Sequence, residues 1–126
     1  NEVYTILDNK GLFLFDITRK ENSLRYFIDH LDYENYNDFS YIRHSYFKPD
    51  TSDQINDFTI FKRINDKTNC YQRFNEHHVQ KIRSVQKIKS FIPENKFKIL
   101  GIWDGFTFKK YSTKSERIHF LLQRIN

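Results

Sequence analysis

The sequence predicts an α/β fold that also contains a separate antiparallel sheet. Residues 12–15 form an unbroken apolar run, typical of a strand buried on both faces in the parallel part of an α/β sheet. Residues 97–103 and 118–122 are almost as apolar and predict two further buried strands. Within residues 38–82 the side chains alternate with a period of two, which predicts three consecutive antiparallel strands.

Helical patterns connect these predicted strands. Residues 2–7 predict the last turns of a helix that enters from upstream and ends at a turn before Gly11. Residues 22–31 combine a polar cap with apolar side chains at i, i+3, i+4 and i+7, which predicts a helix lying against the sheet. Ser84 begins another predicted helix, which Pro93 ends.

The composition indicates one domain of 126 residues, with 38% hydrophobic and 17% aromatic residues. Its core must be built largely from rings. We expect a soluble, cytoplasmic protein, because the longest apolar runs are too short to span a membrane and the single cysteine, Cys70, excludes an internal disulfide. Methionine is absent and the chain begins Asn1-Glu2, so we expect that an upstream segment is missing.

The charge is unevenly distributed along the chain. Residues 1–63 contain 8 Lys or Arg against 11 Asp or Glu, whereas residues 64–126 contain 13 against 5. Such asymmetry raises the hypothesis of nucleic-acid binding. The cations of the second half are nevertheless spread out, without an arginine-rich run, so a solvated helix face is the favoured explanation.

The glycines exclude a nucleotide-binding loop within this chain. Such a loop needs several glycines close together at the start of a helix, so that backbone N–H groups can approach phosphate. Gly11, Gly101 and Gly105 lie too far apart for this purpose. Any nucleotide-like cofactor would be held elsewhere.

The densest group of titratable side chains is Glu76-His77-His78. A shared metal site is disfavoured, because His77 and His78 point to opposite faces of a strand and no third ligand is near in the sequence. One of these side chains could contact a substrate or accept a proton, although ordinary surface polarity also explains them.

Tyr41, Arg43, Tyr71 and Arg73 allow two interpretations. They could combine stacking with cationic contact to a ligand, or they could stabilise the sheet through cross-strand packing, which is the simpler explanation. Asp16 directly follows an apolar strand, where α/β sheets place ligand-binding side chains, and it is therefore a candidate functional residue.

Four segments of the chain, taken in order, resemble class I S-adenosylmethionine-dependent methyltransferases. The first resembles the family's "E-V-Y-x-x-L-K-P-G-G-x-F-x-F-D-I" passage into its fifth strand, the second its "R-F-x-E-x-H" strand, the third its sixth strand and the fourth its closing "S-E-R-I-x-F" strand. These segments are residues 2–17, 73–77, 97–101 and 115–120.

The resemblance implies the C-terminal half of such an enzyme, acting on a small molecule. Strands five, six and seven of a Rossmann-like sheet would be present, with a three-stranded antiparallel sheet inserted at about residues 38–82 over the substrate side. S-adenosylmethionine would be bound mostly outside this chain. The implied catalytic candidates are Asp16, Glu76 and His77, and the implied substrate-binding residues are Tyr41, Arg43 and Arg73.

A strand taken from the middle of a sheet leaves one edge unpaired and invites association. We therefore expect a partner, which would be the upstream cofactor-binding segment or another chain. The sequence is also compatible with two other functions: a non-catalytic methyltransferase-like subunit that pairs through its open edge, and a basic nucleic-acid-binding module.

Overall fold

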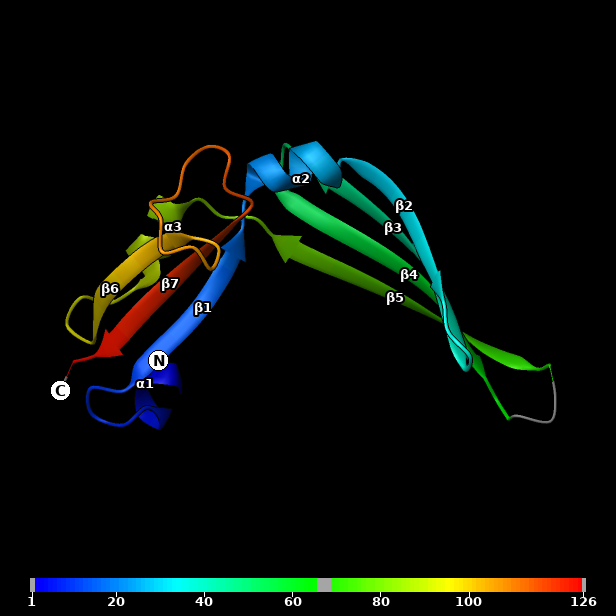
Figure 1. The fold of residues 1–126 in the computed structure, drawn as a ribbon, viewed down its shortest axis with the longest axis horizontal. Coiled ribbons are helices and arrows are strands. Elements are labelled where there is room, and N and C mark those ends of the chain that lie inside the picture. Colours follow the sequence, from blue (N-terminus) through cyan, green and yellow to red (C-terminus); the bar gives the residue numbers. More distant parts are fainter. Residues whose placement is uncertain (1, 66–68, 126) are drawn as a thin grey trace. The chain divides into compact units, whose positions relative to one another are not determined.

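The computed structural model describes residues 2–65 and 69–125, shown in Figure 1. The chain forms two compact units. The first unit consists of the residues up to Asn22 and those from Ile82 onwards, and the second unit is Ser23–Lys81. The second unit is thus inserted into the sequence of the first. That residues 1–126 act as one domain stays a prediction.

The first unit contains a sheet of three strands, β1 (Leu12–Thr18), β6 (Phe97–Asp104) and β7 (Arg117–Arg124). Their order is β1-β7-β6, and β7 is antiparallel to both neighbours (Figure 1). It follows that β1 and β6 run parallel to each other. All three predicted buried strands are therefore confirmed as strands.

Two helices accompany this sheet, α1 (Glu2–Ile6) and α3 (Val85–Phe91). Helix α3 begins where the sequence predicts, because the Ser84 side chain caps it and accepts a hydrogen bond from the Lys87 backbone N–H at 3.1 Å. The helix ends at Phe91, and its C-cap Ile92, which immediately precedes Pro93, has an extended backbone. Both boundaries are thus determined by local side-chain chemistry.

The core of the first unit lies on one face of its sheet. Ile118 and Phe120 are completely buried there, and Val85 of α3 packs against them. The Phe15 ring stacks on Phe120 at a centroid distance of 5.0 Å. Ring stacking thus joins β1 to the middle strand. The prediction that the core is built largely from rings is nevertheless wrong for the described residues, because five of the eight buried hydrophobic residues are aliphatic: Ile55, Ile82, Val85, Ile118 and Leu122.

The other face of β1 is open. Leu12 and Leu14 are 55% and 56% exposed, so the prediction that residues 12–15 are buried on both faces is not met by the described residues. Among those residues, β1 pairs only with β7, and its second edge has no partner. Within the described residues, β1 therefore has exposed apolar side chains and one unpaired edge.

The second unit is a four-stranded antiparallel sheet in sequence order. Its strands are β2 (Asp29–Asn35), β3 (Phe39–Lys48), β4 (Asp53–Arg63) and β5 (Tyr71–Lys81). The sequence predicts three antiparallel strands here, and β3, β4 and β5 confirm them. The prediction of a three-stranded sheet was wrong because β2 adds a fourth strand.

Strand β2 occupies part of the segment predicted as a helix. Helix α2 (Lys20–Tyr26) ends early, with its last turn closed by the Phe27 N–H donating to the Ser23 carbonyl at 3.0 Å. The chain then pairs with β3, placing Leu31 opposite His44. Strand pairing with a distant segment therefore overrides the helical spacing of Leu31.

No helix in the described part of the chain has the length and apolar content that a membrane span requires.

Removing the Phe120 ring should destabilise the first unit strongly. We expect Phe120→Ala to lower the free energy of unfolding by about 3–5 kcal/mol, because the ring is completely buried and its loss leaves a cavity. Urea unfolding followed by the fluorescence of Trp103, which belongs to the same unit, measures the change. Ile6→Ala is the control, since Ile6 is 80% exposed and should change stability by no more than about 0.5 kcal/mol. Equal losses in the two variants would contradict this account of the core.

Candidate functional site

A polar and aromatic groove lies on one face of the sheet of the second unit. Arg43, Phe58 and Glu76 are aligned directly opposite one another on β3, β4 and β5, so their side chains share a face. The groove has a volume of about 570 Å³. We call it the ring groove, and its principal lining residues are Tyr41, Arg43, Asn56, Phe58, Glu76 and His78.

Aromatic rings form the centre of this groove. The rings of Tyr41 and Phe58 lie 5.8 Å apart in a tilted arrangement, and His78 meets Phe58 edge-on at 5.5 Å. Burial raises the pKa of the Tyr41 hydroxyl, and the charges of Glu34 and Asp32 raise it further. The phenol is therefore neutral at physiological pH and can donate a hydrogen bond.

Arg43 is fixed by an ion pair within the sheet. Its Nε donates to both carboxylate oxygens of Asp32 at 3.1 Å, and its Nη2 also contacts Asp32 Oδ2. The guanidinium carbon lies 6.0 Å from the ring centroids of both Phe27 and Phe58. The charge of Arg43 is thus balanced inside the sheet, and the side chain supports the wall of the groove.

Glu76 and His78 form a hydrogen-bonded pair along the groove. His78 Nε2 lies 2.8 Å from Glu76 Oε2, and both side chains are about half exposed. The two residues are separated by one position on β5, so strand alternation places them on the same face. This pair can accept hydrogen bonds or a proton from a molecule in the groove.

His77 and Arg73 lie on the opposite face of the sheet. His77 Nδ1 contacts Asp57 Oδ1, and Asp57 is directly across from His77 on β4. This contact is the largest cause that lowers the pKa of Asp57, while burial opposes it. Burial also raises the pKa of Tyr46, and the charge of Asp57 raises it further.

Asp16 belongs to the first unit, where it forms an ion pair with Arg117. Arg117 Nε donates to Asp16 Oδ2 at 2.6 Å, and Nη2 contacts the same oxygen. Asp16 lies within residues 2–17, the first segment that resembles methyltransferases, and Arg117 lies within residues 115–120, the last one. The pair joins β1 to β7 at the position where Asp16 lies opposite His119 and Arg117 lies opposite Thr18.

The structure brings together only some of the predicted site residues. Tyr41, Arg43 and Glu76 line the ring groove, but Arg73 and His77 face away from it. The sequence indicates His78 only as one of three side chains that could contact a substrate, and it indicates no role for Asp32. Glu76 and His78 are two positions apart on a predicted strand, which indicates that they share a face. Asp32 can be assigned to this face only from the pairing of β2 with β3. The functional roles of all these residues stay predictions.

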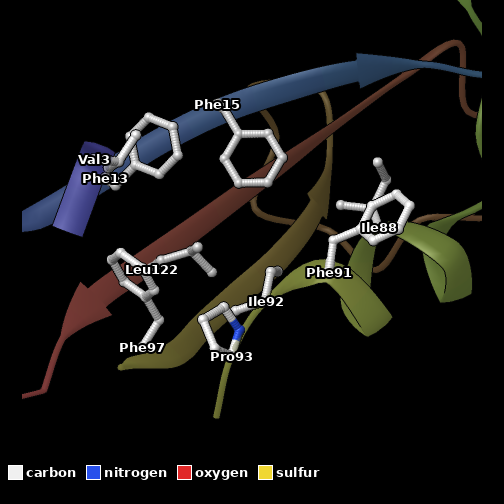
Figure 2. Close-up of a pocket in the computed structure, with 9 residues that line it drawn as sticks. All are labelled: Val3, Phe13, Phe15, Ile88, Phe91, Ile92, Pro93, Phe97 and Leu122. Carbon is white, nitrogen blue, oxygen red and sulfur yellow. The ribbon is translucent and has the colours of Figure 1, made fainter. Parts of the chain in front are cut away.

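Apart from the ring groove of the second unit, a pocket of about 470 Å³ lies in the first unit, between its helices and its sheet. Figure 2 shows that α1 contributes Val3, β1 contributes Phe13 and Phe15, and α3 contributes Ile88 and Phe91. The lining residues carry no titratable side chain. This pocket is therefore suited to holding apolar groups and not to acid–base chemistry.

The described residues do not form a cradle for a nucleotide-like cofactor. A Cβ at Gly11 would lie 2.8 Å from the Asp8 carbonyl oxygen, and a Cβ at Gly101 would lie 2.0 Å from the Trp103 ring, so tight packing within the first unit explains both glycines. Gly105 adopts a positive φ of 51° in a turn. Within residues 2–65 and 69–125, no group of three His, Cys, Asp or Glu side chains could hold a metal ion.

No protein-family model matches the chain. Two curated proteins whose names begin "Putative methyltransferase" do match it. They are YqeM of Bacillus subtilis (strain 168), 27% identical over 122 residues, and a protein of Geobacillus sp. (strain WCH70), 28% identical over 124 residues. The alignments cover 97% and 98% of this chain but 48% and 49% of those proteins. The chain therefore spans about half the length of the curated relatives it matches.

Solved structures give the same result for the fold. A S-adenosylmethionine-dependent methyltransferase from Clostridium acetobutylicum ATCC 824 superposes with a TM-score of 0.75 at 21% identity. The CcbJ methyltransferase from Streptomyces caelestis superposes with a TM-score of 0.65 at 6% identity. The matches cover 98% and 99% of this chain and 48% of each structure. The predicted resemblance to methyltransferases is confirmed, and the chain has the fold of about half of one.

The contact between Asp57 and His77 makes the stability of the second unit depend on pH. The folded pKa of Asp57 lies below its ordinary value of 3.8, so the ionised carboxylate stabilises the fold above pH 3.8. This contribution is lost as the pH falls from 3.8 through the folded pKa. We expect Asp57→Asn to be less stable than the wild type at pH 7, with a difference that shrinks towards pH 2. Urea unfolding followed by far-ultraviolet circular dichroism measures it.

His77→Gln is the matched variant for this experiment. This variant removes the imidazole partner of Asp57 and leaves the carboxylate in place. Its stability difference from the wild type should therefore also shrink towards pH 2. A difference for Asp57→Asn that stays constant between pH 7 and pH 2 would show that the contact with His77 does not stabilise the ionised carboxylate.

Proposed function

We propose that this chain is the C-terminal portion of a S-adenosylmethionine-dependent methyltransferase that acts on a small-molecule acceptor. The observation that carries the proposal is the superposition of 98% of the chain on 48% of such a methyltransferase at a TM-score of 0.75. A match that uses nearly all of one chain and half of the other is expected when one chain corresponds to a portion of the other.

In this proposal β1, β6 and β7 are the fifth, sixth and seventh strands of a Rossmann-like sheet. The strand order supports the assignment. The last strand of the chain, β7, lies between β1 and β6 and is antiparallel to both, whereas β1 and β6 are parallel to each other. The helix α3 before β6 fits the alternation of strands and helices in such a sheet.

The free edge of β1 is where the rest of the sheet would continue. This edge has no partner among the described residues, and Leu12 and Leu14 leave apolar surface exposed beside it. The partner would be the upstream cofactor-binding segment or another chain. S-adenosylmethionine would be held there, since the described residues lack a suitable glycine-rich loop.

The ring groove is the best candidate for the acceptor side. It is a concave surface that combines apolar rings with a few polar groups, as ligand sites do. Of the three predicted catalytic residues, Glu76 is the one that lines it. Tyr41 and Arg43 form the wall of the groove. Arg73, His77 and Asp16 do not line the groove and have no role in it in this proposal.

The free edge also supports a second candidate function, a non-catalytic methyltransferase-like subunit that pairs with another chain through β1. An unpaired strand edge beside exposed leucines favours such pairing. Light scattering together with calorimetry distinguishes the two candidates, because a non-catalytic subunit requires a stable complex with another chain but no binding of S-adenosylmethionine.

Cofactor binding tests the main proposal. We expect calorimetry to detect binding of S-adenosylmethionine by this chain joined to the residues encoded upstream of Asn1, and no binding by the 126-residue chain alone. The joined protein with Leu14→Asp is the matched variant. A charge on the exposed side of β1 should weaken docking of the other half, and with it cofactor binding. Absence of binding by the joined wild-type protein would remove the proposal.

A further inference from the structure

We propose that the ring groove binds a ligand in which a flat apolar ring carries a positively charged amine, and that Glu76 receives the amine. The proposal deepens the proposed function, on which it depends for treating this ligand as the acceptor. The binding itself is argued from the residues of the second unit alone.

The rings of the groove provide a surface for a flat apolar group. Tyr41 and Phe58 stand on neighbouring strands, and their ring centroids are 5.8 Å apart. His78 fixes the other side of Phe58 by an edge-on contact at 5.5 Å. Aromatic surfaces held in this way favour stacked or edge-on contact with a further ring.

The charges on this face favour a cation. Asp32, Glu34 and Glu76 share the face with two cations, Arg43 and Lys62, as the strand register shows. With the histidines counted as neutral, the face carries one more negative charge than positive. Lys62 lies at its far end, opposite Phe39, and does not line the groove.

Arg43 is poorly suited to binding an anionic ligand. Two of its nitrogens are engaged with Asp32, so an anion would have to compete with a carboxylate already held in a forked arrangement. The guanidinium also packs near Phe58. Glu76 is therefore the main charge that the groove offers to a ligand, and aromatic faces beside it add attraction for a cation.

His78 is a positioning residue in this proposal. Its Nε2 lies 2.8 Å from Glu76 Oε2, which holds the carboxylate on the groove side of β5. An ammonium group in the groove could then donate to Glu76 while its ring lies on Tyr41 and Phe58. Glu76 is the cross-strand partner of Phe58, so the carboxylate and the ring stand next to each other on this face, and a short aliphatic link between ring and amine is sufficient.

Nuclear magnetic resonance titration of the isotope-labelled 126-residue chain tests the proposal with two matched probes. Tyramine carries an ammonium group, and 3-(4-hydroxyphenyl)propionate carries a carboxylate on the same ring and linker. At pH 7 and low salt we expect tyramine to shift the signals of Tyr41, Phe58 and Glu76 with a dissociation constant of millimolar order, as its size allows. The propionate should not shift them.

Two variants locate the binding site. Glu76→Gln keeps the shape of the side chain and removes its charge, so it should weaken tyramine binding by at least about fivefold. Arg73→Gln, on the opposite face of the same strand, should leave it unchanged. Tighter binding of the propionate, no shift with tyramine, or equal losses in the two variants would each overturn the proposal. None of these outcomes alters the calorimetric test of cofactor binding, so the two proposals fail separately.

Discussion

Cross-strand register aligns Arg43, Phe58 and Glu76 in one row across β3, β4 and β5, and the chemistry of the second unit depends on this alignment. A slip of one residue in β5 would exchange Glu76 and His78 for side chains of the opposite face. The pairing of β2 with β3 contributes equally, because it brings Asp32 to Arg43 and balances a charge that would otherwise dominate the groove. The site is thus a product of strand pairing.

The first unit buries its core on one face of a sheet with few strands. Its middle strand β7 carries the fully buried Ile118 and Phe120, and both neighbouring strands pair with it. One face is covered by helix α3, while Leu12 and Leu14 stay exposed on the other. On that second face His119 of β7 is buried, so burial at the middle strand is not limited to the face that α3 covers.

Much of the fold could be predicted from the sequence wherever local chemistry decides it. Strands β3, β4 and β5 lie within residues 38–82, where alternation predicts three strands, and α3 begins after Ser84 because the cap is local. Strand β2 could not be predicted, since residues 24–31 have helical spacing and only pairing with β3 makes their second half a strand. Strand alternation predicts that His77 and His78 lie on opposite faces. Which of the two lies in the groove depends on the register of β5 with β4, which the sequence alone does not reveal.

The insertion of the second unit has a consequence for the order of folding. Asp16 pairs with His119, so the sheet of the first unit closes only when segments about a hundred positions apart meet. Within the second unit, Gln54 donates to the Phe27 carbonyl and lies opposite Gln80, which draws the beginning and the end of that unit together. If the hairpins of the second unit form first, they shorten the effective loop between β1 and β7. The rate at which β1 pairs with β7 would then depend on the prior folding of the inserted sheet.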